Sequence, residues 1–132
     1  MRLEYFGIRV KSMEESIKFY TKGLGMALVA EPKKFPPTGG FYAYVKSPSS
    51  PQIIELNWYP KSYVKGYKKG DELDHLGFTL KRGEDMDVVM KRLVELGGKV
   101  KIPPYISGRT KLGFVEDPNG VWIELLERVR RK

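Results

Sequence analysis

One pattern of residues occurs twice in this chain, at a spacing of about 70 residues. Three blocks of the first half recur in the same order in the second half: 5–10 with 75–80, 24–26 with 96–98, and 54–56 with 123–125. Three matches in one order at a nearly constant spacing indicate a tandem duplication. The fold is therefore expected to consist of two similar modules.

Each half has the pattern of a βαβββ module. The first predicts a strand over 3–10, then a helix opened by a capping box at Ser12 and Glu15 and ending near 23–25, then strands near 27–30, 41–46 and 52–58. The second predicts a strand over 73–80, a helix over about 84–96, strands near 99–102, 112–116 and 121–126, and a hairpin turn at 117–120. We expect an α+β fold in which tandem βαβββ modules form a concave mixed sheet with helices on its outer face. Residues 1–132 are expected to form a single domain, with modules at about 1–58 and 73–127 and a crossover loop at 59–72.

Composition narrows the class of protein. The chain has 132 residues, 41% hydrophobic and 30% charged, which is typical of a globular domain. It has no cysteine, which excludes disulfides and thiolate metal sites. No apolar stretch approaches the roughly 20 residues of a membrane span, so a cytoplasmic protein without a membrane partner is expected.

The net charge of +8 raises the question of a nucleic-acid partner. Lysines and arginines are scattered along the chain, and a dense basic run occurs at 128–132. No predicted helix or hairpin presents these charges as one stripe. A solvated basic surface is therefore expected, rather than a nucleic-acid interface.

Charged and polar residues stand at equivalent positions of the two modules. Glu55 and Glu124 each lie in the middle of an apolar strand, on the strand face opposite the leucines and isoleucines. His75, the single histidine, lies on the corresponding face of the strand over 73–80, two residues before Gly77. A carboxylate at such a position is costly to bury unless it is paired or binds a metal. Carboxylate oxygen and imidazole nitrogen together favour a divalent first-row metal.

Four segments carry a resemblance to a known family: SIKFY (16–20), IELN (54–57), DHLGF (74–78) and FVEDPNG (114–120). Over nearly all of 3–127 the chain resembles the vicinal oxygen chelate superfamily. This superfamily includes glyoxalase I, methylmalonyl-CoA epimerase, extradiol dioxygenases and bleomycin and other antibiotic resistance proteins. The chain is most similar to glyoxalase I-like proteins, which implies the glyoxalase fold. The motifs are specific for the fold and much less specific for the reaction.

The resemblance implies a divalent metal ion (Ni, Co, Zn or Mn) held by one residue from the first and last strand of each module: Tyr5, Glu55, His75 and Glu124. Members of the family normally have His or Gln where this chain has Tyr5. A neutral phenol is a poor ligand. Three roles therefore stay open for Tyr5: weak coordination, a hydrogen bond to a water beside the metal, or closure of the site.

The resemblance also implies roles in a reaction. Glu124 is the expected base of a lyase or isomerase that shuttles a carbon-bound proton of a 2-oxoaldehyde adduct or similar small molecule, with Glu55 as the opposed catalytic carboxylate. Arg9 stands where glyoxalase I has an arginine for the glutathione carboxylate. Asn57 is similar to the asparagine that follows the first glutamate, so both are expected to bind substrate. Glyoxalase I-like relatives share their sites between two subunits, which implies a homodimer.

Two other functions remain open on the residues alone. An acyl-CoA epimerase uses the same proton shuttle, and lysines of the crossover loop (Lys61, Lys65, Lys68 and Lys69) could meet a nucleotide phosphate. A non-enzymatic binding or resistance protein needs no metal, and aromatic side chains could line its pocket: Tyr5, Tyr42, Tyr44, Trp58 and Trp122.

Overall fold

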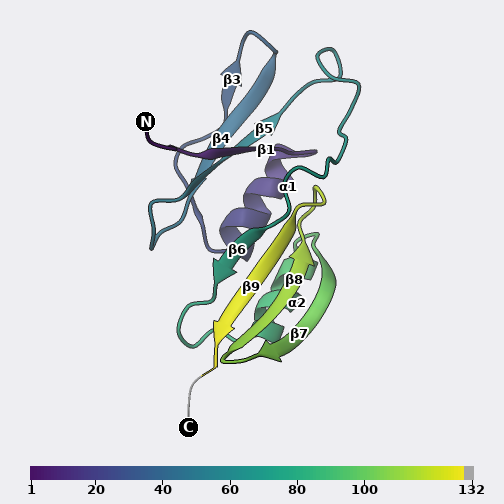
Figure 1. The fold of residues 1–132 in the computed structure, drawn as a ribbon. Coiled ribbons are helices and arrows are strands. Elements are labelled where there is room, and N and C mark those ends of the chain that lie inside the picture. The colour runs from purple at the N-terminus through teal and green to yellow at the C-terminus, as the bar shows by residue number, and fades with distance from the viewer. Residues whose placement is uncertain (130–132) are drawn as a thin grey trace. The chain divides into compact units, whose positions relative to one another are not determined.

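The computed structural model describes residues 1–129, so residues 130–132 of the basic run lie outside the described residues. The chain forms two compact units, Met1–Lys69 and Gly70–Lys132, each with its own mixed sheet (Figure 1). The boundary between the units falls inside the predicted crossover segment. The expected α+β class is confirmed, and each module forms a separate sheet.

The first unit contains one helical segment and five strands. In chain order its elements are β1 (Phe6–Arg9), α1 (Met13–Lys18), the π-helix η1 (Phe19–Gly23), β2 (Ala27–Leu28), β3 (Lys33–Phe35), β4 (Gly40–Lys46) and β5 (Ile53–Trp58). The strand order is β1-β5-β4-β2, with β3 also paired to β4. β1 and β5 are parallel, whereas the other pairs are antiparallel.

The second unit repeats this topology. Its elements are β6 (Leu76–Thr79), α2 (Met86–Glu95), β7 (Lys99–Ser107), β8 (Thr110–Glu116) and β9 (Trp122–Arg128). The strand order is β6-β9-β8-β7, and the parallel pair again joins the first and last strands of the unit. Apart from the additional strand β3, the two units have the equivalent strand order, which confirms the duplication inferred from sequence.

One face of each sheet supplies the core of its unit. In the first unit Ile8, Val45 and Leu56 are buried, together with Phe19 and Tyr20 of the helical segment. In the second unit the buried set is Val115, Ile123 and Leu125 from the sheet, with Met86, Val89, Met90 and Leu93 from α2. Because side chains alternate across a strand, Glu55 and Glu124 lie on the opposite sheet face in each unit. The predicted orientation of both glutamates is confirmed.

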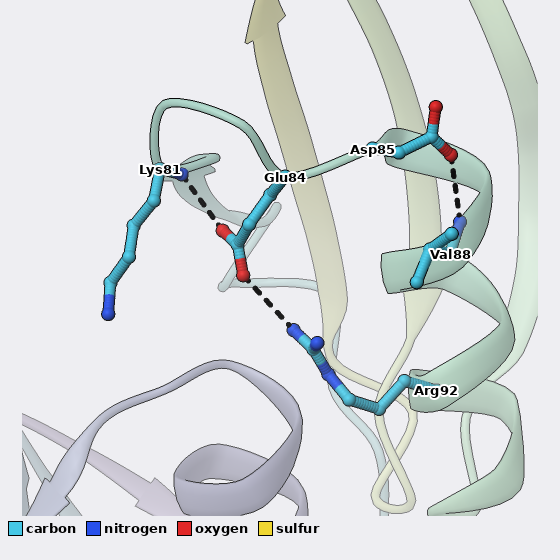
Figure 2. Close-up of polar contacts among 5 residues, drawn as sticks. All are labelled: Lys81, Glu84, Asp85, Val88 and Arg92. Carbon is cyan, nitrogen blue, oxygen red and sulfur yellow. Dashed lines mark hydrogen bonds and ion pairs between the residues drawn. The ribbon is translucent and has the colours of Figure 1, made fainter.

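Both helices begin at side-chain caps. The Ser12 hydroxyl accepts a hydrogen bond from the backbone N–H of Glu15 at 3.3 Å, as the capping box predicts. In α2 the Asp85 carboxylate accepts from the N–H groups of Asp87 and Val88. Figure 2 shows the second of these bonds, to Val88. The helix therefore begins at Met86, two residues later than predicted.

Glu84 holds the loop before α2 in place, as Figure 2 also shows. Its carboxylate accepts from the backbone N–H of Lys81 at 2.9 Å and from the Arg92 guanidinium at 3.4 Å. An acidic residue that ties a loop to the following helix explains why Glu84 precedes the helix rather than belonging to it.

Two segments differ from the expectation. β3, which pairs with β4, lies in a stretch for which no strand was predicted. β7 extends to Ser107, well past the predicted end at 102, although residues 103 and 104 are prolines. β7 is an edge strand, and its register against β8 shifts on both sides of Ile102. Proline is tolerated at such positions because no ladder hydrogen bond is lost.

The turn from β8 to β9 follows the prediction at 117–120. The buried Asp117 carboxylate accepts from the backbone N–H groups of Asn119 and Val121, both at 2.8 Å, and from the Asn119 side-chain amide at 3.1 Å. Gly120 has φ of 90°, a conformation that favours glycine. This turn sets the start of β9 and hence the position of Glu124. Within residues 1–129 no helix is long and apolar enough to cross a membrane.

Candidate active site

His75 and Glu124 face one another in the second unit. The parallel pairing of β6 with β9 places Gly77 beside Glu124, and His75 immediately precedes β6. The Nε2 atom of His75 lies 3.2 Å from Oε2 of Glu124. A Cβ atom at Gly77 would lie 3.9 Å from that same oxygen, so the glycine leaves the carboxylate room above the sheet.

The other ring nitrogen of His75 is held by its neighbour in sequence. Nδ1 makes a short hydrogen bond with Oδ1 of Asp74. A histidine that donates Nδ1–H to a carboxylate presents the Nε2 lone pair for coordination, and this pairing is common around protein metal sites. The hydrogen bond to Asp74 raises the pKa of His75 above its ordinary value, and the negative charge of Glu124 adds to this effect while burial opposes it.

One aromatic ring contacts the imidazole, and a second packs behind the first. The ring of Phe114 lies edge-on to His75, with centroids 5.6 Å apart, and Trp122 lies 5.9 Å beyond Phe114. Phe114 stands opposite Glu124 in the β8–β9 ladder. His75 and Glu124 therefore lie at the edge of an apolar patch, with 37% and 22% of their side chains exposed.

Glu55 has the corresponding position in the first unit. It lies between Gly7 of β1 and Tyr44 of β4, which are its direct partners in the two adjacent ladders. A Cβ atom at Gly7 would lie 3.8 Å from Oε1 of Glu55 and 3.3 Å from Nδ2 of Asn57. The glycine again leaves space for polar side chains above the sheet.

Tyr44 joins Glu55 to Tyr5. Hydrogen bonds of the Tyr44 side chain with Glu55 and Tyr5, together with burial, raise the pKa of Tyr44 above its ordinary value. The rings of Tyr5 and Tyr44 meet edge-on at 5.3 Å. Tyr5 is thus in ring contact with the ladder partner of Glu55, although it precedes the first residue of β1.

Arg9 and Asn57 lie together on this face. They are direct partners in the β1–β5 ladder, two residues beyond Gly7 and Glu55 toward the strand end and therefore on the same face. The Arg9 guanidinium stacks on the ring of Tyr59 at 4.5 Å, and Nδ2 of Asn57 donates to the backbone oxygen of Glu55 at 3.3 Å. The first unit therefore assembles four of the predicted site residues, namely Tyr5, Arg9, Glu55 and Asn57.

The donor chemistry of both groups fits a divalent cation. His75 Nε2 and Glu124 Oε2 are spaced as two ligands of one ion would be, since ligands at about 2.0–2.2 Å from a metal lie roughly 3 Å apart. Glu55 provides a further carboxylate. Within residues 1–129, no three His, Asp or Glu side chains are grouped so as to hold an ion by themselves. The complete set of four ligands, which needs residues of both units, stays a prediction.

Two residues next to these site residues were not predicted from the sequence to have a role there, namely Asp74 beside His75 and Tyr44 beside Glu55. Asp74 adjoins His75, and a carboxylate next to a candidate ligand is a usable signal for its partner. Tyr44 was considered only as a pocket residue. Its signal is the antiparallel pairing of β4 with β5, which puts it opposite Glu55.

Comparison with known proteins places this geometry in a family. Residues 2–125 match the Glyoxalase/Bleomycin resistance protein/Dioxygenase superfamily. The chain belongs to this superfamily. The lactoylglutathione lyase of Salmonella typhimurium is 33% identical over 134 residues, which cover 96% of this chain and 93% of that protein. The family resemblance inferred from the motifs is thereby confirmed.

Solved structures of the superfamily have the same fold. The trypanothione-dependent glyoxalase I of Leishmania major is 28% identical, with a TM-score of 0.72 over 96% of this chain and 86% of that chain. Glyoxalase I from Zea mays has a TM-score of 0.77 at 24% identity and covers 98% of this chain and 45% of that chain. The relatives are enzymes, which supports a glyoxalase I-like enzyme over an acyl-CoA epimerase or a non-enzymatic binding protein.

The Asp74–His75 contact predicts a shifted titration. We expect Asp74→Ala to lower the pKa of His75, because the main interaction that stabilises the imidazolium is removed. The proton should then leave the ring at a lower pH than in the wild-type protein. Proton NMR of the metal-free protein measures this directly, since the chain has one histidine.

Asp71→Ala is the matched control, because Asp71 is also an exposed aspartate of the same segment. It should leave the midpoint of His75 in place. An Asp74→Ala protein that titrates at the wild-type midpoint would show that Asp74 does not hold the ring.

Proposed function

We propose that this protein is a glyoxalase I-like, metal-dependent lyase that moves a carbon-bound proton of a 2-oxoaldehyde–thiol adduct or a similar substrate. The observation that carries the proposal is the pair of His75 Nε2 and Glu124 Oε2 at 3.2 Å, on a β6–β9 pair opened by Gly77. The pair occurs in a chain one third identical to a lactoylglutathione lyase. The proposal does not specify which thiol forms the adduct. One relative is named as a lactoylglutathione lyase, whereas the Leishmania relative is named as trypanothione-dependent.

A divalent ion (Ni, Co, Zn or Mn) would be held by His75, Glu124, Glu55 and, more weakly, Tyr5. When bound, such an ion acts as a Lewis acid and stabilises negative charge that develops on substrate oxygen atoms. The orientation of His75 by Asp74 supports a ligand role for Nε2, since ligating histidines commonly donate their other nitrogen to a carboxylate.

Glu124 is the residue proposed to move the proton. Its carboxylate is 22% exposed, so it can meet a substrate that approaches the sheet from the open face. It also contacts His75, which keeps it close to the proposed ligand set. A carboxylate within hydrogen-bond reach of the substrate carbon can accept the proton and return it to the adjacent carbon.

Arg9 and Asn57 are proposed to bind the substrate. The Arg9 guanidinium lies over the ring of Tyr59, with Cζ 4.5 Å from the centroid, a cation–π contact that restrains the side chain. Such a cation on the face that carries Glu55 suits an anionic group of the thiol part of the substrate. Asn57, its ladder partner, adds a side-chain amide beside it.

We further propose that the two units form a single domain and that two copies of the chain form a cytoplasmic homodimer, with each site shared between subunits. The proposed ligands come from both units of the chain, Glu55 from one and His75 with Glu124 from the other. Sedimentation velocity at micromolar protein tests the assembly, and a monomer with full metal affinity would contradict it.

The different roles of Glu124 and His75 can be separated by substitution. Glu124→Gln should keep much of the metal affinity, because the amide oxygen can still coordinate, and should lose roughly 10²–10⁴-fold in activity. His75→Ala should lose metal and activity together. Metal titration and hydrogen exchange from a 2-oxoaldehyde–thiol adduct measure the two properties independently.

Glu95→Gln, an exposed change at the end of α2, is the control and should alter neither property. Exchange at the wild-type rate in Glu124→Gln would remove Glu124 as the base. Unchanged metal affinity in His75→Ala would remove the ligand set.

Tyr5 stands where members of the family normally have His or Gln as a metal ligand. Restoring the histidine is therefore predicted to raise the metal affinity. Tyr5→His should bind the metal more tightly, because a neutral imidazole is a better ligand than a phenol. Competition with a chromophoric chelator measures the change. Tyr63→His places a histidine at an exposed loop position of the same unit and should leave the affinity unaltered. Equal affinities for Tyr5→His and the wild-type protein would mean that residue 5 does not reach the ion.

A further inference from the structure

Part of the crossover segment, residues 59–69, belongs to the first unit and contacts the end of β1. Tyr59 directly follows β5, and the Arg9 guanidinium lies 4.5 Å from the centroid of its ring. The ammonium group of Lys11 likewise lies 5.3 Å from the ring centroid of Tyr67. Both distances are those of cation–π contacts. Two cations at the end of one strand thus each meet a tyrosine of this segment.

The ring of Tyr59 is held from other sides as well. It stacks on the ring of Tyr63, with centroids 5.4 Å apart and an interplanar angle of 28°. The backbone N–H groups of Tyr63 and Val64 donate to the Pro60 carbonyl oxygen at 2.9 and 3.1 Å, which closes a turn at the start of the segment. A Cβ atom at Gly40, the first residue of β4, would lie 3.2 Å from Cδ1 of Tyr59. The glycine therefore lets the tyrosine pack closely against the sheet.

Arg9 carries a positive charge that no acidic side chain neutralises. Among residues 1–129, none of the ion pairs involves its guanidinium, and the residue is exposed. Its ladder partner on the same sheet face is Asn57. At the equivalent positions of the second unit Thr79 pairs with Leu126, so the repeated backbone does not require a cation beside an amide. A guanidinium with an amide next to it suits a carboxylate or phosphate group of a ligand.

We propose that Tyr59 is a positioning residue that holds the Arg9 guanidinium beside Asn57, where it binds an anionic group of the substrate. This inference rests on the proposed function, in which Arg9 and Asn57 bind the substrate. A free arginine side chain loses conformational entropy when a ligand fixes it. A ring that restrains the side chain beforehand reduces this loss, and thereby strengthens binding. Tyr59 acts on the affinity for the substrate and not on the transfer of the proton.

Three variants separate this role from a structural one. Tyr59→Leu removes the ring, Tyr59→Phe keeps it, and Tyr67→Leu removes the other tyrosine of the segment that meets a cation. In the ligand-free protein, the ¹⁵N–¹H NOE of the Arg9 Nε–H group should fall in Tyr59→Leu and stay at the wild-type value in the other two variants. An unchanged NOE in Tyr59→Leu, or an equal fall in Tyr67→Leu, overturns the proposal.

Steady-state kinetics give the second measurement, with the adduct of methylglyoxal and glutathione as the probe. Tyr59→Leu should raise KM by about 3–30-fold, a ratio that corresponds to the usual strength of a cation–π contact. Its kcat should stay within twofold of the wild-type value. Tyr59→Phe and Tyr67→Leu should keep both constants. An unchanged KM in Tyr59→Leu, or a fall in kcat alone, would contradict the positioning role.

A double substitution shows whether the effect passes through Arg9. Arg9→Gln alone should raise KM, and Tyr59→Leu added to it should raise KM no further, because the ring then has no cation to hold. Additive effects of the two substitutions would rule out the proposed role. If the wild-type protein does not act on the adduct, the proposed function fails for this substrate, whereas the NMR comparison of the ligand-free proteins still decides whether Tyr59 holds Arg9.

Discussion

The parallel pairing of the first and last strands in each module is the constraint on which the candidate site depends. In both units it brings a glycine against a glutamate, Gly7 beside Glu55 and Gly77 beside Glu124. A Cβ atom at either glycine would come into contact with the neighbouring carboxylate, at 3.8 Å from Glu55 and 3.9 Å from Glu124. The same register carries the residue that precedes each first strand, Tyr5 or His75, toward the same face. The positions of the polar groups thus follow from one backbone arrangement made twice.

That arrangement costs stability, because a carboxylate on a half-buried sheet loses part of its hydration. Each unit offsets the cost with a different partner. Glu124 meets the imidazole of His75, whose other nitrogen is bonded to Asp74. Glu55 lies opposite Tyr44 in the β4–β5 ladder, and the ring of Tyr44 meets that of Tyr5 edge-on. The two carboxylates therefore have different neighbours at equivalent positions of the repeated backbone.

Much of the fold and part of the site could be predicted from local patterns. Alternation of apolar residues located Glu55 and Glu124 on the open sheet faces, and the capping residue Ser12 located the start of α1. β3 and the extension of β7 were missed. Lys33–Phe35 has no apolar alternation, and two prolines lie inside β7, so pairing with a neighbouring strand decided both segments.

The sequence by itself determined the duplication, the strand and helix order, and the residue types available for chemistry, because these depend on spacing and composition along the chain. The tertiary structure decided which side chains meet. Tyr44 reaches Glu55 through the antiparallel ladder of β4 and β5, and Gly77 lies beside Glu124 through the parallel pairing of β6 and β9. Such contacts join residues that are distant in sequence, and strand register decides which residues meet. A shift of one residue in register would turn every side chain of the strand to the other face of the sheet.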